Sequence, residues 1–525
     1  MRVRVSLAAL LLAAMSSGAA AQSETSCAAS IRAVMADIAA RDLDTAGGPP
    51  LNAFLTLNPS AVAQAEALDR AAAAGEAKGP LFCMPVAVKD NFDTYDMPAT
   101  VGSLALIGNQ PQRDAPFVAR LRASGAIVVG KTNMDEFAMG IRGLSGAGGR
   151  VGNAYDTRRS AGGSSSGSGA AVGAGLVPLS VGSDNCGSLR IPAVYNGAVS
   201  LRATYGRFDS KGVFPIGFVN GVPGVIARDS ATLNRALAAA SDGWRAAAAE
   251  PADLTGKRIG ILRRFRIDDP WSGAGKDTQA KFAAAIALLR DAGAEIVEDV
   301  TVDDVDHRLG PEYLRGFARR VDASFARYPA GRRDWRDVCT SGLIRPEWTV
   351  EECNALGASS PQVENLAVSR IDRNRKSIVA VMDRHRLDAL AYPTDGSGGA
   401  QADETDHYTC FIAGTSGLPA AAFPIGLDAH GMPLGLELMG PPNADEAMVA
   451  MMAAFEQKRG PLPAARRTEG NPALATLDIA RQNDIRRQLG WRAFQSRRGK
   501  DLGALRPDKF RKLTDEVVKS ALAKH

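Results

Sequence analysis

The sequence contains few histidines and no closely spaced cysteines, and this scarcity excludes common metal sites. Only five histidines occur in 525 residues, and none pairs with another at a metal-ligand spacing: His307, His385, His407, His430 and His525. No two cysteines are arranged as Cys-x-x-Cys. Structural zinc sites are built from such pairs, so we expect no metal site.

The sequence also lacks an excess of one charge and any long apolar run in its body. Lys and Arg number 62 against 57 Asp and Glu, a net charge of +5, which does not indicate nucleic-acid binding. Beyond residue 21 no stretch approaches the roughly 20 apolar residues of a membrane-spanning helix. With 45% hydrophobic residues and 54 glycines, the chain is typical of a large globular protein.

The first 21 residues have the layout of a secretory signal peptide. Arg2 and Arg4 provide a positive start, residues 7–15 form an apolar stretch, and small residues end at Ala21. This order predicts cleavage after Ala21 and a periplasmic or secreted protein. An uncleaved anchor is the alternative, but the apolar stretch is too short to span a bilayer.

Six cysteines would then lie in an oxidising compartment, where disulfides form. An even number permits pairing but does not require it in a chain of this size. Cys339 and Cys353 are close together in a polar segment, and we expect them to form one bridge.

Short apolar runs alternate with amphipathic segments, which predicts an α/β fold with helices on both faces of a sheet. The expected strands are residues 85–88, 126–129, 258–262 and 294–297. One helix is expected over residues 278–289, and another begins at Asp114 as its cap and stops at Gly125.

Two regions depart from this order. Residues 305–385 lose clear periodicity and gain charge. The last 65 residues, 461–525, carry 15 Lys and Arg against 7 Asp and Glu. We interpret them as a basic, partly helical, solvated extension, with surface tethering or partner binding as the alternative.

A glycine- and serine-rich run at residues 162–169 reads GGSSSGSG. Such composition also occurs in flexible linkers. Here the apolar residues 170–181 follow at once, and they require burial, so the glycines belong to a folded core. Residues 182–193 continue as GSDNCGSLRIPA. A serine beside successive backbone N–H groups is suited to act as a nucleophile next to an oxyanion hole.

A serine nucleophile needs a base, and no histidine lies in residues 1–306. A distant histidine stays open, but Lys89 directly follows the apolar strand at 85–88. To work near neutral pH its pKa must fall by about 3 units from about 10.4, at a cost of roughly 4 kcal/mol. From Lys89 alone, a salt-bridged lysine is the favoured interpretation.

Taken together, these stretches resemble the amidase signature family, whose members hydrolyse amides through a Ser-cisSer-Lys triad. The matching motifs occur in the family's order: 79–81, 85–91, 114–115, 130–138, 162–165, 182–193, 417–420, 424–426 and 433–436. Several motifs in sequence are far more specific than any one. The resemblance implies one large mixed β-sheet covered by helices on both faces, over residues 22–460, with a variable specificity region at about 305–410.

The resemblance also implies roles for individual residues. Ser188 is the acylated nucleophile, Ser164 the bridging serine after a cis peptide bond, and Lys89 the base. Backbone N–H groups of Asn185, Cys186, Gly187 and Ser188 form the oxyanion hole, with Ser165, Asp184 and Arg190 in support. No cofactor is implied. The substrate implied is a small-molecule or peptide amide. Read from the residues alone, the candidates for an aromatic pocket are Trp335, Trp348, Tyr392 and Tyr408, with plain packing as the more usual role of such side chains.

The main departure from the family pattern is Cys186, which stands where a glycine or another small residue is usual. Its backbone N–H group can still serve the oxyanion hole. Cys186 as the nucleophile is an alternative, but Ser188 holds the matching position.

Three rival functions remain open from the sequence. Residues 163–167 fit Gly-x-Ser-x-Gly, which would make Ser165 the nucleophile of an α/β-hydrolase with His407 or His430 as base. A binding protein that has lost turnover is a second. An amidotransferase subunit that supplies ammonia is a third, and the export signal disfavours it.

Overall fold

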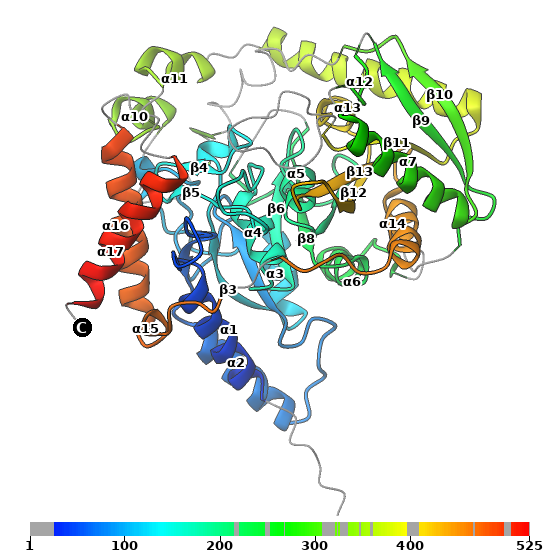
Figure 1. Cartoon of the computed structure of the whole chain (residues 1–525). Helices are drawn as coiled ribbons and strands as arrows, with labels where there is room; N and C mark the ends of the chain where they lie inside the picture. Colours follow the sequence, from blue (N-terminus) through cyan, green and yellow to red (C-terminus); the bar gives the residue numbers. More distant parts are fainter. Residues whose placement is uncertain are drawn as a thin grey trace, which may run out of the picture.

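Figure 1 shows the chain as a computed structural model. It describes residues 26–214, 220–246, 253–266, 268–272, 274–306, 321–322, 324–325, 334–345, 348–357, 361–395, 409–465, 468–497 and 506–523. The expected signal peptide lies outside the described residues, as do His407 and Tyr408.

One mixed sheet of eleven strands forms the centre of the described chain, in the order β1-β3-β2-β6-β8-β7-β12-β13-β11-β9-β10. The strands are β1 (Phe54–Leu57), β2 (Pro85–Lys89), β3 (Ile127–Thr132), β6 (Leu179–Asp184), β7 (Val199–Arg202), β8 (Val222–Ala227), β9 (Arg258–Phe265), β10 (Glu295–Val302), β11 (Ala389–Pro393), β12 (Ala420–Leu427) and β13 (Pro433–Met439). β2 is parallel to both β3 and β6, and β9 is parallel to both β10 and β11. The other pairings are antiparallel, and a separate hairpin joins β4 (Leu144–Ser145) to β5 (Gly149–Arg150).

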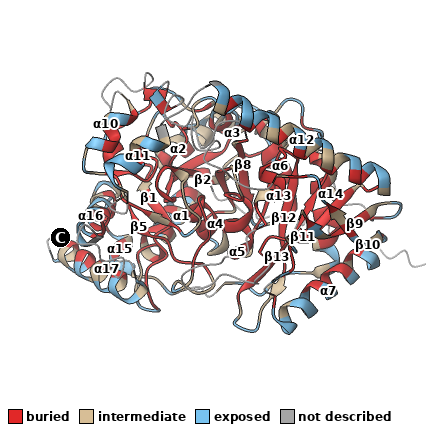
Figure 2. Cartoon of the chain, turned by 90° about the horizontal axis from the view of Figure 1, so that it is seen from above, coloured by how far each residue is buried: buried red, intermediate tan, exposed pale blue. Residues whose placement is uncertain are grey.

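Helices cover both faces of the sheet, which confirms the predicted fold class (Figures 1 and 2). One face packs against α3 (Pro116–Ala123), α6 (Ser230–Ala240), α7 (Lys276–Asp291) and α14 (Asp445–Arg459). The other packs against α1 (Cys27–Arg41), α2 (Ala61–Ala73), α4 (Ser166–Gly173) and α5 (Arg190–Tyr195). Buried residues concentrate between these layers, and the outer helix surfaces are exposed (Figure 2).

The four predicted strands are present as β2, β3, β9 and β10, and the predicted helix at 278–289 is α7. The predicted cap at Asp114 is wrong. Ala115 is the residue before α3, and Pro116 begins the helix. The Asp114 carboxylate instead accepts the Tyr95 N–H and pairs with Arg122 at 3.1 Å, so it fastens a loop to the helix rather than capping it.

The region without clear sequence periodicity contains α10 (Trp335–Thr340), α11 (Val350–Gly357) and the 25-residue α12 (Pro361–His385). The helix α12 was not predicted. Its buried side chains form one narrow stripe at helical spacing, and the rest of its surface is mostly polar, with Leu366 and Val368 exposed. The stripe and α13 (Phe411–Gly414) pack on β9 and β11.

The basic extension contains α15 (Pro472–Ala475), α16 (Ile479–Arg497) and α17 (Pro507–Leu522). Helix α16 packs on the edge strand β1, where the Asn483 amide bonds both the N–H and the C=O of Leu57 at 2.7 and 2.9 Å. Arg486 forms a buried ion pair with Asp42 at 2.9 Å. Helix α16 is therefore docked on the sheet, α17 packs on α16 and α15 packs on α1, so these helices are not a solvated appendage.

All six cysteines are paired, as Cys27–Cys83, Cys186–Cys410 and Cys339–Cys353. The predicted bridge between Cys339 and Cys353 is confirmed. Short 3₁₀ turns span Leu104–Leu106 and Glu136–Ala138. Within the described ranges, no helix combines the length and the apolar character needed to cross a membrane.

Candidate active site

Two neighbouring parallel strands end side by side in the interior of the sheet. β2 ends at Lys89 and β6 at Asp184. Side chains alternate along a strand, and Val86 and Val88 belong to the core under α3 and α6, whereas Ala87 belongs to the core under α4 and α5. Lys89 therefore lies on the side of α4 and α5.

The glycine- and serine-rich run leads into α4, and its glycines allow α4 to pack tightly on α5. A Cβ atom on Gly169 would lie 2.4 Å from the Pro192 carbonyl oxygen, and one on Gly173 would lie 2.2 Å from that of Asn196. Any larger side chain would push the two helices apart. This close approach brings the loop before α4 beside the loop before α5.

Lys89 lies in the space between these loops. Its Nζ atom is 2.9 Å from Ser164 Oγ and 2.9 Å from Ser183 Oγ. The peptide bond between Gly163 and Ser164 is cis. Ser183, on β6, also accepts a hydrogen bond from the Asn91 amide at 3.3 Å. The sequence interpretation named Ser164 but missed Ser183, although both lie within the quoted motifs.

The buried position of Lys89 changes its protonation. Burial removes the ammonium group from water and lowers the pKa of Lys89 to about 7, although Asp135 and Asp184 partly oppose this shift. Near neutral pH a large fraction of Lys89 is therefore an uncharged amine. Such an amine can accept a proton, as a general base must.

Ser188 lies between β6 and α5, and its main chain contacts the residue that follows Ser164. Its carbonyl oxygen accepts the Ser165 N–H at 3.2 Å, and the residue is only 4% exposed. Among the described residues, no hydrogen bond joins the hydroxyls of Ser164 and Ser188. Catalytic hydrogen bonds in unliganded enzymes commonly tighten only when substrate binds.

Asp184 organises the loop before Ser188. Its carboxylate accepts the N–H groups of Gly187 at 3.0 Å and Leu189 at 3.1 Å. The Gly187 N–H is thus already engaged, in contrast to its expected part in an oxyanion hole. Within the described chain, the N–H groups of Asn185, Cys186 and Ser188 have no such acceptor.

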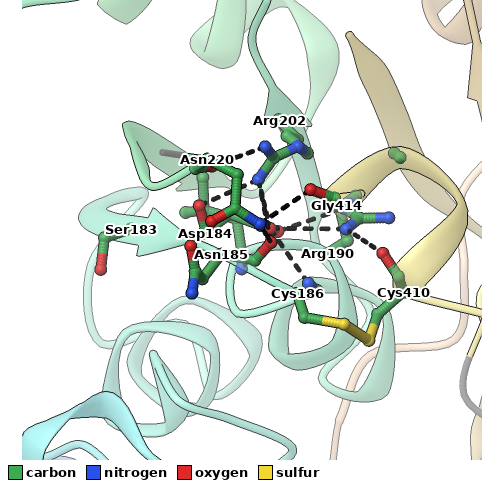
Figure 3. A network of polar contacts seen from close by, with 12 residues as sticks. Ser183, Asp184, Asn185, Cys186, Arg190, Arg202, Asn220, Cys410 and Gly414 are labelled. Atoms are coloured by element: carbon green, nitrogen blue, oxygen red, sulfur yellow. Dashed lines mark hydrogen bonds and ion pairs between the residues drawn. A yellow bond between two sulfur atoms is a disulfide. The ribbon is translucent and has the colours of Figure 1, made fainter. Parts of the chain in front are cut away.

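Two arginines surround Asp184 in a buried ionic network (Figure 3). Arg190 and Arg202 lie 3.1 and 2.9 Å from its carboxylate, and all three side chains are inaccessible to water. Burial raises the pKa of Asp184, but the two guanidinium groups outweigh it and hold this pKa well below its usual range. Arg190 also pairs with the buried Glu437 on β13. The network joins the loop at 184–190 to the distant C-terminal strands.

The rival hydrolase assignment finds no support in this geometry. The Ser165 hydroxyl donates to the Ser183 carbonyl at 3.2 Å and accepts the Ser183 N–H at 3.3 Å, so it is committed to the backbone of β6. His430 is exposed in the turn between β12 and β13. The Cys186 sulfur is bonded to Cys410 and is not a free thiol.

The aromatic candidates occupy two places. Trp335 and Trp348 contact the ring of Phe137, with centroids 5.0 and 6.3 Å apart respectively. Tyr392 is fully buried on strand β11, and it packs in a different part of the hydrophobic core from these rings. In the described part of the chain, no group of three His, Cys, Asp or Glu side chains is arranged to hold a metal ion.

Known proteins resemble this chain in both sequence and fold. The amidase family model matches residues 44–449. A glutamyl-tRNA(Gln) amidotransferase subunit from Nocardia farcinica is 33% identical over 459 residues, which cover 78% of this chain and 92% of that protein. The corresponding protein from Rhodopirellula baltica is 43% identical, but over 48% of this chain and 53% of its own length. The chain thus spans about half the length of some of the curated relatives that it matches.

The fold comparison agrees. The native peptide amidase of Stenotrophomonas maltophilia superposes with a TM-score of 0.75 at 29% identity, covering 84% of this chain and 95% of that enzyme. The eleven-stranded sheet, the order of motifs and these matches define the class of protein. The chain belongs to the amidase family.

Proposed function

We propose that the protein is an amidase that hydrolyses a carboxamide C–N bond, with Ser188 as nucleophile, Ser164 as bridging hydroxyl and Lys89 as base. The observation that carries this proposal is the contact of 2.9 Å between Lys89 Nζ and Ser164 Oγ. The two residues are 75 positions apart in sequence, and both side chains are buried. A lysine with a pKa of about 7 is matched to proton transfer near neutral pH.

The proposed reaction has two stages. Neutral Lys89 takes the proton of Ser164 while Ser164 takes that of Ser188, and Ser188 Oγ forms a bond to the amide carbonyl carbon. The C–N bond then breaks, the relayed proton goes to the leaving amine or ammonia, and an acyl-enzyme remains on Ser188. Water attacks this ester by the same proton path and releases the acid.

The negative charge on the former carbonyl oxygen needs donors. We assign the N–H groups of Asn185, Cys186 and Ser188 to this task, because backbone donors fixed in place stabilise an oxyanion without reorganisation. Gly187 serves by shaping the loop, since its own N–H binds Asp184. The ion pair between Asp184 and Arg190 fixes the loop, and the Ser165 hydroxyl bonds the Ser183 carbonyl of β6.

For the substrate, we propose the amide of a peptide or of a small carboxylic acid. Support comes from the resemblance to a peptide amidase over most of both chains. Neither a metal nor an organic cofactor takes part in the proposed steps. We further propose that the amidase domain spans residues 22–460 and that the helices of residues 461–525 stiffen its edge through β1.

We also propose that the protein is exported and works in the periplasm or outside the cell. Support comes from the pairing of all six cysteines, because disulfides persist mainly in oxidising compartments.

Release of ammonia or amine from a panel of aliphatic, aromatic and peptide-terminal amides tests the activity. The wild type should turn over at least one class, and intact-mass analysis at early times should reveal an added acyl group on Ser188. Ser188→Ala should lose the acyl group and the turnover together. Equal turnover by Ser188→Ala would refute the assignment.

A second candidate is ammonia supply to a partner, which the 43% identity to a glutamyl-tRNA(Gln) amidotransferase subunit favours. Such a subunit would release ammonia from glutamine. Strong preference for free glutamine over peptide amides in the same panel would favour this candidate over the first.

A further inference from the structure

We propose that the disulfide between Cys186 and Cys410 is a positioning element of the oxyanion loop, so that full turnover requires this bond to be oxidised. The inference rests on the proposed function, because it assigns a part to the loop that precedes Ser188. We call this bond the loop disulfide.

The loop disulfide joins two parts of the chain that are 224 residues apart. Cys186 is the second residue of the turn between β6 and α5, two positions before Ser188. Cys410 immediately precedes the short helix α13. Figure 3 shows the sulfur bridge directly beside the ionic network of Asp184. The covalent bond therefore ends at one of the residues whose N–H we assign to the oxyanion.

Hydrogen bonds tie the same two segments together. The Asn220 amide donates to the carbonyl oxygens of both Asn185 and Gly414, at 3.3 and 2.8 Å. Arg190 donates to the Cys410 carbonyl at 3.1 Å. These bonds hold the main chain on either side of the loop disulfide, but none of them reaches the N–H group of Cys186.

The backbone of Gly187 lies close against the loop disulfide. Its φ is +79°, and a Cβ atom added to it would lie 2.7 Å from the Cys410 Cβ. The backbone between Cys186 and Ser188 thus passes over the disulfide with no room for a side chain. Opening the bond would release the Cys410 side chain against which the turn packs, while the hydrogen bond from Arg190 to the Cys410 carbonyl would stay in place.

We expect opening of the loop disulfide to affect only the stabilisation of the oxyanion. The hydrogen bonds from Asn220 and Arg190 remain after the bond opens, so we expect the fold and the substrate site to persist. The Cys186 N–H group would no longer be held in one orientation. A donor aimed at a developing oxyanion acts on kcat more than on KM, because the interaction strengthens in the transition state.

The test compares two double variants. Cys186→Ala with Cys410→Ala removes the loop disulfide, and Cys27→Ala with Cys83→Ala removes a bridge that ties α1 to the turn before β2. We expect the first to lower kcat at least tenfold with KM changed less than threefold, and the second to keep kcat within twofold. Near-UV circular dichroism checks that both are folded.

A titration of the wild type with reductant keeps the test independent of how the variants fold. Mass analysis of alkylated thiols identifies which bridge has opened at each step. Cys186 is partly exposed, so reductant can reach it. Loss of kcat should follow alkylation at Cys186 and Cys410, and should not follow alkylation at the other four cysteines.

The outcomes separate the inference from the proposed function. If kcat is unchanged after the loop disulfide is removed or reduced, while Ser188→Ala is inactive, the inference is wrong and the proposed function stands. If Ser188→Ala retains turnover, the proposed function falls and the inference falls with it. A loss of kcat that is equal in both double variants would also overturn the inference.

Discussion

Lys89 Nζ lies 2.9 Å from Ser183 Oγ, a residue on the neighbouring strand β6. With Ser164 on its other side, the amine contacts two hydroxyl groups, and among the described residues no carboxylate pairs with it within salt-bridge distance. This distinguishes it from the buried Lys131, which lies 3.5 Å from Asp90. Two hydroxyl groups hold the amine in place without the charge–charge attraction that a carboxylate would add, so the contacts are compatible with an uncharged lysine that accepts the Ser164 proton.

Ser183→Ala should lower kcat/KM by about tenfold to a hundredfold, because it releases one side of the general base. The lost acceptor also stabilised the ammonium form, so the rise of the pH–rate profile should move to lower pH. Ser180→Ala is the matched control on the same strand, since its buried hydroxyl bonds only the Ala87 carbonyl. An unchanged pH–rate profile in Ser183→Ala would contradict the assignment.

Lys89→Met should stabilise the protein, and the gain should depend on pH. The pKa of Lys89 is lowered from 10.5 to about 7, so between these values the unfolded state binds more protons and wild-type stability rises with pH. The advantage of the variant should therefore be greatest below pH 7 and shrink towards pH 10.5, by at most about 1.4 kcal/mol per pH unit. Urea denaturation at pH 6.5, 8 and 9.5 measures it, and a constant difference would disprove the shift.

Arg190→Met should destabilise the fold by about 3–5 kcal/mol, because Glu437 and Asp184 would lose a buried partner. Lys376→Met is the control. Its ion pair with Asp372 is short, at 2.8 Å, but exposed, so its loss should cost less than about 1 kcal/mol. Chemical denaturation of the two variants and the wild type measures the loss in the free energy of unfolding for each. Similar losses would mean that the network does not support the loop as described.

Asn483→Ala should cost about 2 kcal/mol, because it leaves both backbone groups of Leu57 without their partner. Gln488→Ala, five residues further along α16, removes only a bond to Asp484 and should change stability by less than about 0.5 kcal/mol. Thermal denaturation distinguishes the two. Equal melting temperatures for Asn483→Ala and wild type would favour the solvated extension expected from the sequence.

Local sequence patterns predicted much of the fold. The strands β2 and β3 are short apolar runs with glycine or polar residues at their ends, so their burial is visible in the sequence. The apolar residues of β9 and β10 also located these strands, although β10 is an edge strand whose side chains are mostly not buried. Motif order predicted the mixed sheet. The grouping of Lys89 with Ser164 came from the family resemblance, because a contact across 75 residues leaves no trace in periodicity.

Features that depend on distant contacts were missed. Asp114 is a residue type that caps helices, but its carboxylate instead accepts the Tyr95 N–H and forms an ion pair with Arg122. The buried stripe of α12 contains only one or two residues per turn, and the many charged residues between them obscure the helical periodicity in the sequence. Cys186 and Cys410 are separated by 224 residues, and sequence spacing cannot pair them. Ser183 was missed because its part depends on where the Lys89 side chain ends.

The pH dependence of kcat/KM tests the central claim most directly, since the claim is that an uncharged Lys89 draws the proton from Ser188 through Ser164. With the best amide of the panel, wild-type kcat/KM should rise between pH 6 and 8 with an apparent pKa of about 7. Lys89→Ala should lose at least about a hundredfold in rate and this rise with it. Undiminished turnover by Lys89→Ala, with the same pH profile, would contradict the account.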